Sequence, residues 1–255
     1  MDFDGKRVLV TGATRGIGGA TARAFHRRGA QVAINGTTAE GVGRAIEAMG
    51  NGPRLVPAPG DVGSAKGCGA LVAAAVEALG GLDVLINNAG INSLTGSSET
   101  ADEEVWDRLF DVNAKGTFFC SQAALPALRA SMGNIVNLGS HSGLMGTPPM
   151  TVYCATKGAV VNLTRTMALE LAPEVRVNAI CPGVVATDMM EAALEAAEDR
   201  AALEKAVEEY TPLKTLAGAD EIAEAIVYLA SEDARFVTGA TWQIDGGTTA
   251  GPRVV

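Results

Sequence analysis

Residues 8–18 read VLVTGATRGIG, a short apolar run followed by glycines at positions 12, 16 and 18. The apolar run predicts a buried strand, and the residues after it have the pattern of a helix. Glycines between a strand and a helix let backbone amides and the positive helix end approach a pyrophosphate. The spacing G-x-x-x-G-x-G differs from both G-x-G-x-x-G and G-x-x-x-x-G-K-[ST]. The loop therefore predicts a site for a phosphate-bearing ligand.

The alternation of short apolar runs with longer Ala- and Leu-rich segments continues along the chain. It predicts parallel strands that crossover helices cover on both faces. The expected strands are Arg7–Val10, Gln31–Asn35, Arg54–Pro57, Val84–Asn87, Asn134–Leu138, Val175–Ile180 and Thr241–Ile244. The expected helices are Ile17–Arg28, Ala39–Met49, Ala65–Leu79, Ala101–Met132, Val152–Ala172 and Asp220–Ala230.

About seven strands with intervening helices predict an α/β fold, a doubly wound Rossmann-type parallel sheet in a single domain over residues 1–255. The ligand crevice of such a sheet lies beyond the carboxyl ends of its strands. Residues 188–210 break the rhythm, because they are rich in Ala and Glu and contain no strand pattern. We expect them to form a helical lid over the substrate, with Leu194, Leu203 and Val207 turned inward.

The charge balance excludes several classes of partner. Twenty Lys and Arg residues against 29 Asp and Glu residues give a net charge of −9, the wrong sign for nucleic acid or an anionic membrane. No apolar stretch approaches the roughly 18 residues of a membrane-spanning helix, and the start MDFDGKRVLV lacks a signal-peptide pattern. We expect a cytoplasmic protein that binds neither nucleic acid nor membrane.

The cysteines predict neither a metal site nor a disulfide framework. Cys68, Cys120, Cys154 and Cys181 are far apart without a C-x-x-C pair, and the chain has only two histidines. A Cys/His zinc site would be difficult to assemble from these residues. We expect reduced thiols and no bound metal.

The residues after the second expected strand predict the choice of dinucleotide. An acidic residue there binds the ribose hydroxyls of NAD in many sites, whereas a nearby basic residue favours the 2′-phosphate of NADP. The strand is followed instead by Gly36, Thr37 and Thr38, and no carboxylate occurs before Glu40. Arg15 in the glycine loop can reach the same place. We therefore expect NADP(H) as the preferred cofactor, with NAD(H) as the alternative.

Ser140 stands just past the strand expected at 134–138, and Tyr153 and Lys157 lie four positions apart in the following helix. That spacing puts both side chains on one helix face. At roughly 4 Å and an effective dielectric near 20, an ammonium stabilises a phenolate by about 4 kcal/mol. The pKa of the phenol would then fall from about 10 to about 7, where proton transfer is most effective. An isolated Y-x-x-x-K pair is commonly a surface feature, but here it shares a sheet edge with the glycine loop.

With these motifs the sequence resembles the short-chain dehydrogenase/reductase family over nearly its whole length. The resemblance is carried by TGATRGIG at 11–18, Asp61-Val62, NNAG at 87–90, Asn113, Ser140, Tyr153 with Lys157, Pro182-Gly183 with Thr187, and DGG at 245–247. Within the family, the glycine loop and the region near Gly36 are similar to those of 3-oxoacyl carrier-protein reductases.

The resemblance implies a role for each matching residue. Tyr153 would be the general acid in carbonyl reduction and the base in alcohol oxidation, and Ser140 would bind the substrate oxygen. Lys157 would hold the nicotinamide ribose, and Asn113 would fix a water that links Lys157 to solvent. The implied cofactor contacts are Gly12, Thr14, Arg15, Gly16, Ile17, Gly18, Gly36, Thr37, Thr38, Asp61, Val62, Asn88, Ala89, Gly90, Asn113, Tyr153, Lys157, Pro182, Gly183, Val185 and Thr187.

The resemblance implies an NADP(H)-dependent oxidoreductase that interconverts a carbonyl and a secondary alcohol of a small molecule by hydride transfer. It also implies a homotetramer assembled through the helices expected at 101–132 and 152–172. The alternatives are a catalytically silent NAD(P)-sensing protein, a sugar-nucleotide epimerase or dehydratase, and a 3-oxoacyl carrier-protein reductase. The presence of Ser140, Tyr153, Lys157 and Asn113 together disfavours the sensor, because a sensor needs no proton relay.

His141 directly follows Ser140 and invites comparison with a serine hydrolase. The local sequence Gly139-Ser140-His141-Ser142-Gly143 has His at the centre, so the G-x-S-x-G elbow of those enzymes is absent. A histidine in the wall of the pocket or facing solvent is the favoured interpretation. Apolar residues such as Met145 between Ser140 and Tyr153 could line an adaptable substrate pocket or pack the loop.

Overall fold

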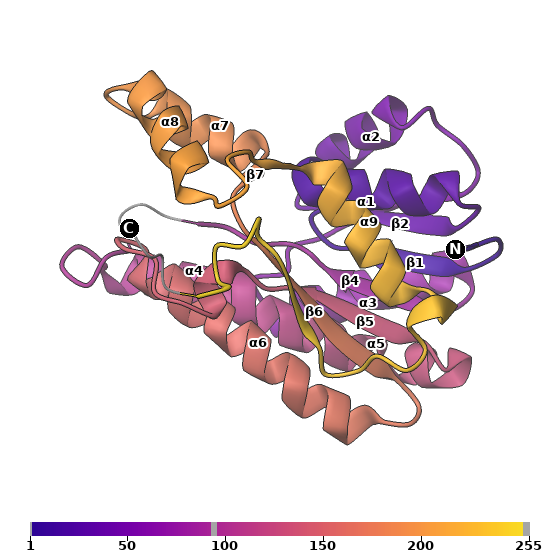
Figure 1. The fold of residues 1–255 in the computed structure, drawn as a ribbon. Coiled ribbons are helices and arrows are strands. Elements are labelled where there is room, and N and C mark those ends of the chain that lie inside the picture. Colours follow the sequence, from indigo (N-terminus) through magenta and orange to yellow (C-terminus); the bar gives the residue numbers. More distant parts are fainter. Residues whose placement is uncertain (1, 93–95, 252–255) are drawn as a thin grey trace.

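The structure is a computed structural model and describes residues 2–92 and 96–251. Seven parallel strands form one sheet in the order β3-β2-β1-β4-β5-β6-β9 (Figure 1). They are β1 Arg7–Val10, β2 Gln31–Gly36, β3 Leu55–Pro59, β4 Val84–Asn87, β5 Asn134–Leu138, β6 Arg176–Pro182 and β9 Thr241–Ile244. The predicted doubly wound α/β sheet is confirmed, with the reversal of strand order between β1 and β4.

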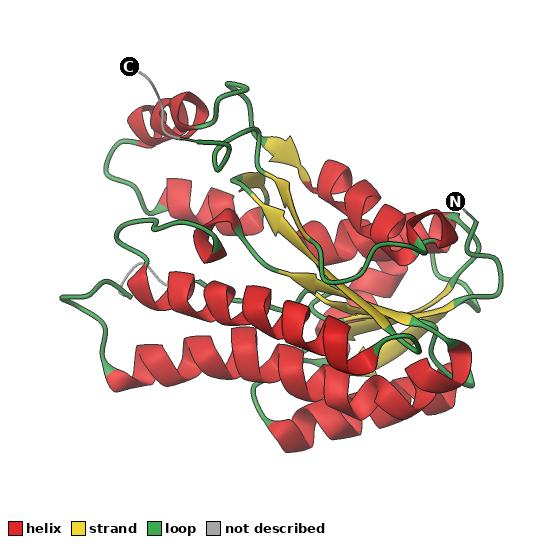
Figure 2. Ribbon diagram, turned by 60° about the horizontal axis from the view of Figure 1, so that its bottom comes forward, coloured by secondary structure: helices red, strands yellow, loops and turns green. Residues whose placement is uncertain are grey.

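The two faces of the sheet carry separate apolar cores. Val8 and Val10 of β1 join the core beneath one group of helices, whereas Leu9 between them joins the opposite core, as the alternation along a strand requires. The first group of helices is α1 Gly16–Arg27, α2 Ala39–Ala48 and α9 Ala219–Ala230. The second is α3 Ala65–Leu79, α5 Gly116–Ser131 and α6 Thr151–Leu171 (Figure 2). Burial on both faces explains why the central strands are almost wholly apolar.

The single helix predicted over Ala101–Met132 was wrong. The segment is divided into α4 Glu103–Phe110, a π-helical turn η1 Asp111–Lys115, and α5. Gly116 follows the turn, and a Cβ there would lie 2.9 Å from the Val62 carbonyl oxygen. The backbone of α5 therefore approaches the end of β3 more closely than a residue with a side chain would permit. Single π turns of this kind are frequent at functional sites.

Residues 188–210 form two helices, α7 Asp188–Glu195 and α8 Arg200–Tyr210, so their predicted helical character is confirmed. They project from the sheet beside the end of β6 (Figure 1). Two short strands flank this α7–α8 segment. β7 Val185–Ala186 precedes it, β8 Ala217–Gly218 follows it, and the two strands pair with each other. Leu194 is buried, and Leu203 and Val207 are half-buried. Of the three residues predicted to turn inward, only Leu194 is fully buried.

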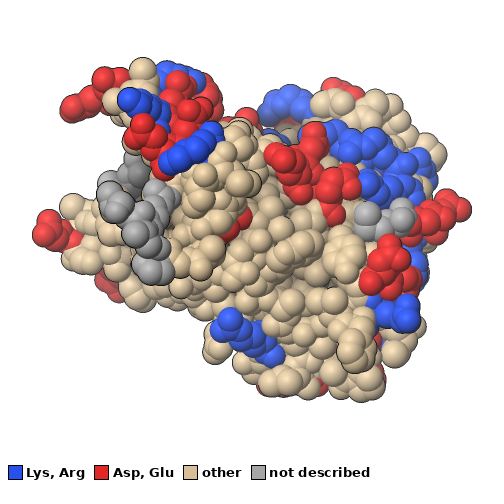
Figure 3. Space-filling view, viewed as in Figure 1, with Lys and Arg blue, Asp and Glu red and all other residues tan. Residues whose placement is uncertain are grey.

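The distribution of charge differs sharply between parts of the surface. Figure 3 shows Lys, Arg, Asp and Glu gathered on the α7–α8 segment and around α1 and α9, and a broad face over β6 and α6 on which charged residues are few. In the described part of the chain no helix is long and apolar enough to cross a bilayer. The same residues contain no group of three His, Cys, Asp or Glu side chains that could hold a metal ion. All four cysteines are free.

Candidate active site

The glycine loop is held against the sheet by contacts that leave no room for side chains. Gly12 and Gly16 adopt φ values of +60° and +55°, a region that favours glycine. A Cβ on Gly18 would lie 2.3 Å from both the Gly12 carbonyl oxygen and Asn88 Nδ2. The predicted glycine positions are therefore required by backbone conformation and by packing.

The end of β2 locks this loop in place through Asn35. Its Oδ1 accepts a hydrogen bond from the Gly12 amide at 3.1 Å, and its Nδ2 donates to the carbonyls of Ala58 and Gly60 at 2.9 and 3.0 Å. Only 2% of Asn35 is exposed. Sequence reasoning used the position only to note a missing carboxylate and so missed this role. The signal was an amide at the end of an otherwise apolar strand.

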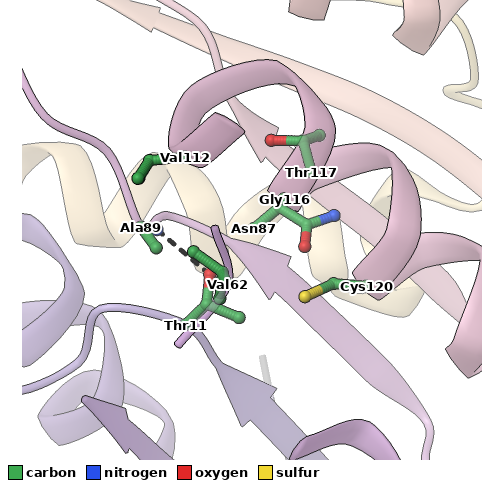
Figure 4. A pocket seen from close by; sticks show the side chains of 8 residues that line it. All are labelled: Thr11, Val62, Asn87, Ala89, Val112, Gly116, Thr117 and Cys120. Atoms are coloured by element: carbon green, nitrogen blue, oxygen red, sulfur yellow. Dashed lines mark hydrogen bonds between the residues drawn. The ribbon is translucent and has the colours of Figure 1, made fainter. Parts of the chain in front are cut away.

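A second lock joins the ends of β1 and β4. Thr11 Oγ1 accepts hydrogen bonds from the amides of Asn88 and Ala89, both at 3.0 Å. Asn88 Nδ2 in turn donates to the carbonyls of Thr11 and Gly12. Figure 4 shows Thr11, Ala89 and Val62 around one pocket, with Cys120 at its far side. The floor predicted for the cofactor is therefore a rigid surface made mostly of main chain.

These residues fit a dinucleotide. No side chain in the described chain caps the first turn of α1, so its amides remain available to a pyrophosphate at a positive helix end. A Cβ on Gly36 would lie 2.5 Å from Thr14 Cγ2, so only glycine keeps the end of β2 close to the loop. Thr38 Oγ1 accepts a hydrogen bond from the Gly41 amide, which leaves its hydroxyl hydrogen free to donate.

We call the glycine loop, the end of β2 and the residues after β4 the cofactor cradle. Arg15 lies in this loop and faces solvent. Its side chain is 79% exposed, and its Nε lies 3.8 Å from the carboxylate of Asp188, which is 61% exposed. Asp188 begins α7, so this ion pair links the glycine loop to the α7–α8 segment. The guanidinium is therefore accessible from solvent.

Ser140, Tyr153 and Lys157 meet at the carboxyl end of β5. Lys157 is buried. Its Nζ donates a hydrogen bond to the Leu138 carbonyl at 2.8 Å and lies 5.7 Å from the centroid of the Tyr153 ring. The Tyr153 hydroxyl shares a side-chain hydrogen bond with Ser140. Ser140 Oγ also accepts from the Ser142 amide at 3.1 Å. The structure therefore brings together the three groups that the sequence spacing predicts to lie close to one another.

The predicted pKa of Tyr153 near 7 is not met in this structure. Burial raises the pKa of Tyr153 to about 12, and the hydrogen bond from Ser140 only partly opposes that rise. Burial also lowers the pKa of Lys157 to about 8. The prediction assumed an ammonium about 4 Å from the hydroxyl, whereas Lys157 is bonded to Leu138. The phenol is thus held protonated at neutral pH, as a proton donor must be.

Asn113 lies in the π turn and is tied to the loop after β4. Its Oδ1 accepts from the Ile91 amide at 2.8 Å, and its Nδ2 donates to the Ile91 carbonyl and to Thr156 Oγ1. A Cβ on Gly90 would lie 3.3 Å from Asn113 Oδ1 and 3.5 Å from Lys157 Nζ. Gly90 therefore lets the asparagine and the lysine approach the same place. Thr156, one residue before Lys157, was missed in the sequence because nothing marks it there.

The end of β6 and the residues after it lie next to the Ser140 turn, because β5 and β6 are paired and His141 contacts the Pro182 carbonyl oxygen at 3.1 Å. A Cβ on Gly183 would lie 2.8 Å from the Asp245 Cα, and the Gly183 amide donates to the Ile244 carbonyl at 3.0 Å. The Thr187 methyl lies 3.7 Å from the place that a Cβ on Gly16 would take. Pro182 and Val185 are buried between these points. The segment and the glycine loop thus face each other.

Comparison with known proteins agrees with this arrangement. A family model described as enoyl-(acyl carrier protein) reductase matches residues 12–249. The chain is 40% identical to 2-(S)-hydroxypropyl-CoM dehydrogenase 3 of Xanthobacter autotrophicus, over 95% of this chain and 96% of that protein. It is 38% identical to meso-2,3-butanediol dehydrogenase of Serratia marcescens, with both chains fully covered. The chain belongs to the short-chain dehydrogenase/reductase family.

A solved structure supports the same assignment. The short-chain dehydrogenase/reductase of Brucella melitensis described as a glucose/ribitol dehydrogenase superimposes with a TM-score of 0.89 at 35% identity. The match covers 97% of this chain and 99% of that one. As a member of the short-chain dehydrogenase/reductase family, the protein is an NAD(P)-dependent oxidoreductase that acts on CH–OH groups of small molecules.

Proposed function

We propose that this short-chain dehydrogenase/reductase interconverts a ketone and a secondary alcohol with NADP(H) as its preferred cofactor and Tyr153 as its proton donor and acceptor. The observation that carries the proposal is the meeting of Ser140, Tyr153 and Lys157 at the sheet edge that also holds the glycine loop. A bound nicotinamide would supply hydride transfer to or from the substrate carbon.

The protein's own residues manage the substrate oxygen and the proton. Ser140 donates a hydrogen bond to the carbonyl oxygen, which fixes that oxygen beside the phenol. Tyr153 gives its proton to the oxygen as the carbon gains hydride. For the Lys157 ammonium to stabilise the resulting phenolate, its Nζ must turn from the Leu138 carbonyl toward the phenol oxygen. In alcohol oxidation the same proton returns to Tyr153. Asn113 is proposed to hold a water through which Lys157 exchanges protons with solvent.

The NADP(H) preference rests on Arg15 and on the absence of a carboxylate among residues 36–38. Arg15→Ala should lower the NADPH to NADH ratio of kcat/KM about 10- to 100-fold, since a charged hydrogen bond is lost. Arg23→Ala is the matched control, because Arg23 is also a partly exposed arginine of the α1 region that pairs with an aspartate. An unchanged ratio in Arg15→Ala would remove the basis for NADP(H) selectivity.

We also propose that the α7–α8 segment is the substrate lid and that the protein is a homotetramer. Several large apolar side chains are exposed, among them Leu169 of α6, Trp242 of β9 and Phe236 just before β9. Exposed apolar area of this kind commonly marks an interface. Light scattering at micromolar concentration should give the mass of four chains, and the mass of one chain would contradict the assembly.

The central experiment is a panel of ketones and secondary alcohols assayed with both cofactors through the absorbance of reduced nicotinamide. Turnover of at least one carbonyl–alcohol pair, faster with NADP(H), is the expected result. Binding of NADPH without turnover of any member, in a folded protein, would favour the catalytically silent sensor. Turnover that requires an acyl carrier protein would identify the carrier-protein reductase instead.

A further inference from the structure

The side chain of His141 is buried in the site, and in the described structure only one of its two ring nitrogens has a hydrogen-bond partner. It begins a short 3₁₀ turn, η2 His141–Gly143, directly after Ser140, and it is only 6% exposed. Its Nδ1 lies 3.1 Å from the Pro182 carbonyl oxygen. Because a carbonyl can only accept, Nδ1 carries the hydrogen, and Nε2 of the neutral ring is left as an acceptor.

That acceptor has no partner. Among residues 2–92 and 96–251 no group forms a hydrogen bond with His141 Nε2, although the atom is buried. The Asp245 carboxylate lies beside the Pro182-Gly183 segment, but its oxygens accept from Gly247 and Thr249. A buried acceptor without a donor costs free energy and commonly marks a place that a ligand or an ordered water fills.

The residues around His141 determine what kind of ligand can reach its Nε2. Its ring centroid lies 6.3 Å from that of Tyr210, the last residue of α8. The Tyr210 hydroxyl lies 3.8 Å from Met145 Sδ, so the wall here combines an aromatic ring with a thioether. None of the α8 residues, all of which the structure describes, is buried. Tyr210 can therefore swing away with α8 and admit a small molecule to Nε2.

We propose that His141 Nε2 accepts a hydrogen bond from a second hydroxyl of the substrate, so that the preferred substrates are hydroxyketones and the corresponding diols rather than simple ketones. The inference rests on the proposed function, in which Ser140 binds the reacting oxygen. Ser140 and His141 both follow the carboxyl end of β5, so one molecule that binds at this edge of the sheet can present one oxygen to each side chain. A substrate hydroxyl would satisfy the orphaned nitrogen, and a methyl group at the same place would not.

The test compares substrates that differ by a single hydroxyl: 2-butanone, 3-hydroxy-2-butanone and 4-hydroxy-2-butanone. The wild type should reduce one of the two hydroxyketones at least about 10-fold more efficiently in kcat/KM than 2-butanone. The better hydroxyketone also shows how far the second oxygen lies from the first. Equal efficiency on all three ketones would overturn the inference and leave the proposed function standing, whereas no reduction of any ketone or oxidation of any alcohol would defeat the proposed function itself.

Two variants separate recognition from packing. His141→Phe keeps a planar ring without an acceptor, and kcat/KM for the preferred hydroxyketone should fall about 10- to 100-fold while that for 2-butanone stays within about 3-fold. His141→Gln restores an acceptor and should recover most of the loss. A parallel fall on hydroxyketone and simple ketone would assign His141 to packing. If His141→Phe does not fold, as judged by NADPH binding, the wild-type preference and the His141→Gln ratio decide the question.

Discussion

The cofactor cradle and the α7–α8 segment are built in opposite ways. In the cradle, Gly12 is held by the Asn35 side chain, and Thr11 fixes the amides of two successive residues after β4. In the α7–α8 segment only Leu194 is buried, and its other residues, all described, are half-buried or exposed. The segment contacts the rest of the protein through the two-residue ladder at its base, the ion pair of Asp188 with Arg15, and the contacts of Tyr210 with His141 and Met145.

The difference follows from what each region has to recognise. A dinucleotide presents the same phosphates and riboses to every protein that uses it, so a rigid surface of main-chain groups can be matched to it. The lid that we propose for the α7–α8 segment would have to open for each substrate, and a segment with few buried contacts opens at little cost in free energy. Rigid chemistry and cofactor binding on one side, and adaptable substrate recognition on the other, are the expected consequences.

The largest expected effect tests whether the rigid region carries the chemistry. Tyr153→Phe should fold and bind NADPH as the wild type does, because the hydroxyl contributes one hydrogen bond to Ser140. Its kcat should fall about 10²- to 10⁴-fold, the usual loss when a positioned acid is removed. Steady-state kinetics and NADPH titration measure the two effects separately.

Tyr228→Phe is the control for that change, since Tyr228 packs against Trp242 away from Ser140. It should keep the wild-type kcat. Retained turnover in Tyr153→Phe would mean that another group gives the proton, and the site would have to be reassigned.

The next effect tests the rigidity of the cradle itself. Gly18→Ala places a Cβ 2.3 Å from the Gly12 carbonyl oxygen and Asn88 Nδ2. Forced overpacking of this kind costs about 1–3 kcal/mol of unfolding free energy, and the displaced loop should bind NADPH at least about 10-fold more weakly. Thermal unfolding and fluorescence titration measure these losses.

Gly43→Ala is the matched control, because apart from its neighbours in α2 no atom of the described residues lies within 4 Å of a Cβ there. In the interior of α2 the alanine should add about 0.5–1 kcal/mol of stability. Equal behaviour of the two alanine variants would show that the loop adapts and that the cradle is not rigid.

The rigid region was also the part most open to prediction from sequence. Val8-Leu9-Val10 is buried on both faces, so its strand could be recognised from composition, and the glycines follow from conformations and contacts that other residues cannot adopt. Asn113 was matched to the family, but the π turn that carries it was not, because residues 103–131 show an unbroken helical pattern. One extra residue in a helical turn leaves no mark in hydrophobic periodicity.

What sequence could not supply was distance and burial. Four positions on a helix place Tyr153 and Lys157 on one face, but whether the ammonium points at the phenol or at the Leu138 carbonyl depends on packing. The predicted fall in the pKa of Tyr153 failed for that reason. The two-residue strands beside the α7–α8 segment were likewise too short to form a pattern.

A third experiment tests whether Lys157 is desolvated in the folded protein, through the pH dependence of the free energy of unfolding. Burial lowers the pKa of Lys157 from 10.5 to about 8, so between these values the unfolded chain binds more protons and wild-type stability rises with pH. Lys157→Met lacks this rise. The stability of the variant relative to the wild type should therefore fall by about 2 kcal/mol from pH 7 to 9.5.

Urea unfolding at the two pH values measures the change, and activity should be lost at both. Loss of the hydrogen bond to Leu138 shifts the comparison equally at every pH and so cancels in the difference. A relative stability that does not vary with pH would show that Lys157 is not desolvated in the folded protein.

The smallest effect concerns the ion pair between Arg15 and Asp188, which joins the two regions. If Arg15 binds the 2′-phosphate as we propose, Asp188 competes with that phosphate for its guanidinium, and both side chains are largely exposed. Asp188→Asn should therefore strengthen NADPH binding by about two- to fivefold at low salt, the size of a surface ion pair, with no change for NADH. Added salt should remove the gain. Asp220→Asn is the control, since Asp220 lies in the first turn of α9 and pairs with Arg23 at 4.0 Å. A weaker affinity for NADPH in Asp188→Asn alone would reverse the inference: the carboxylate would then hold Arg15 ready for the phosphate, and α7 would belong functionally to the cradle.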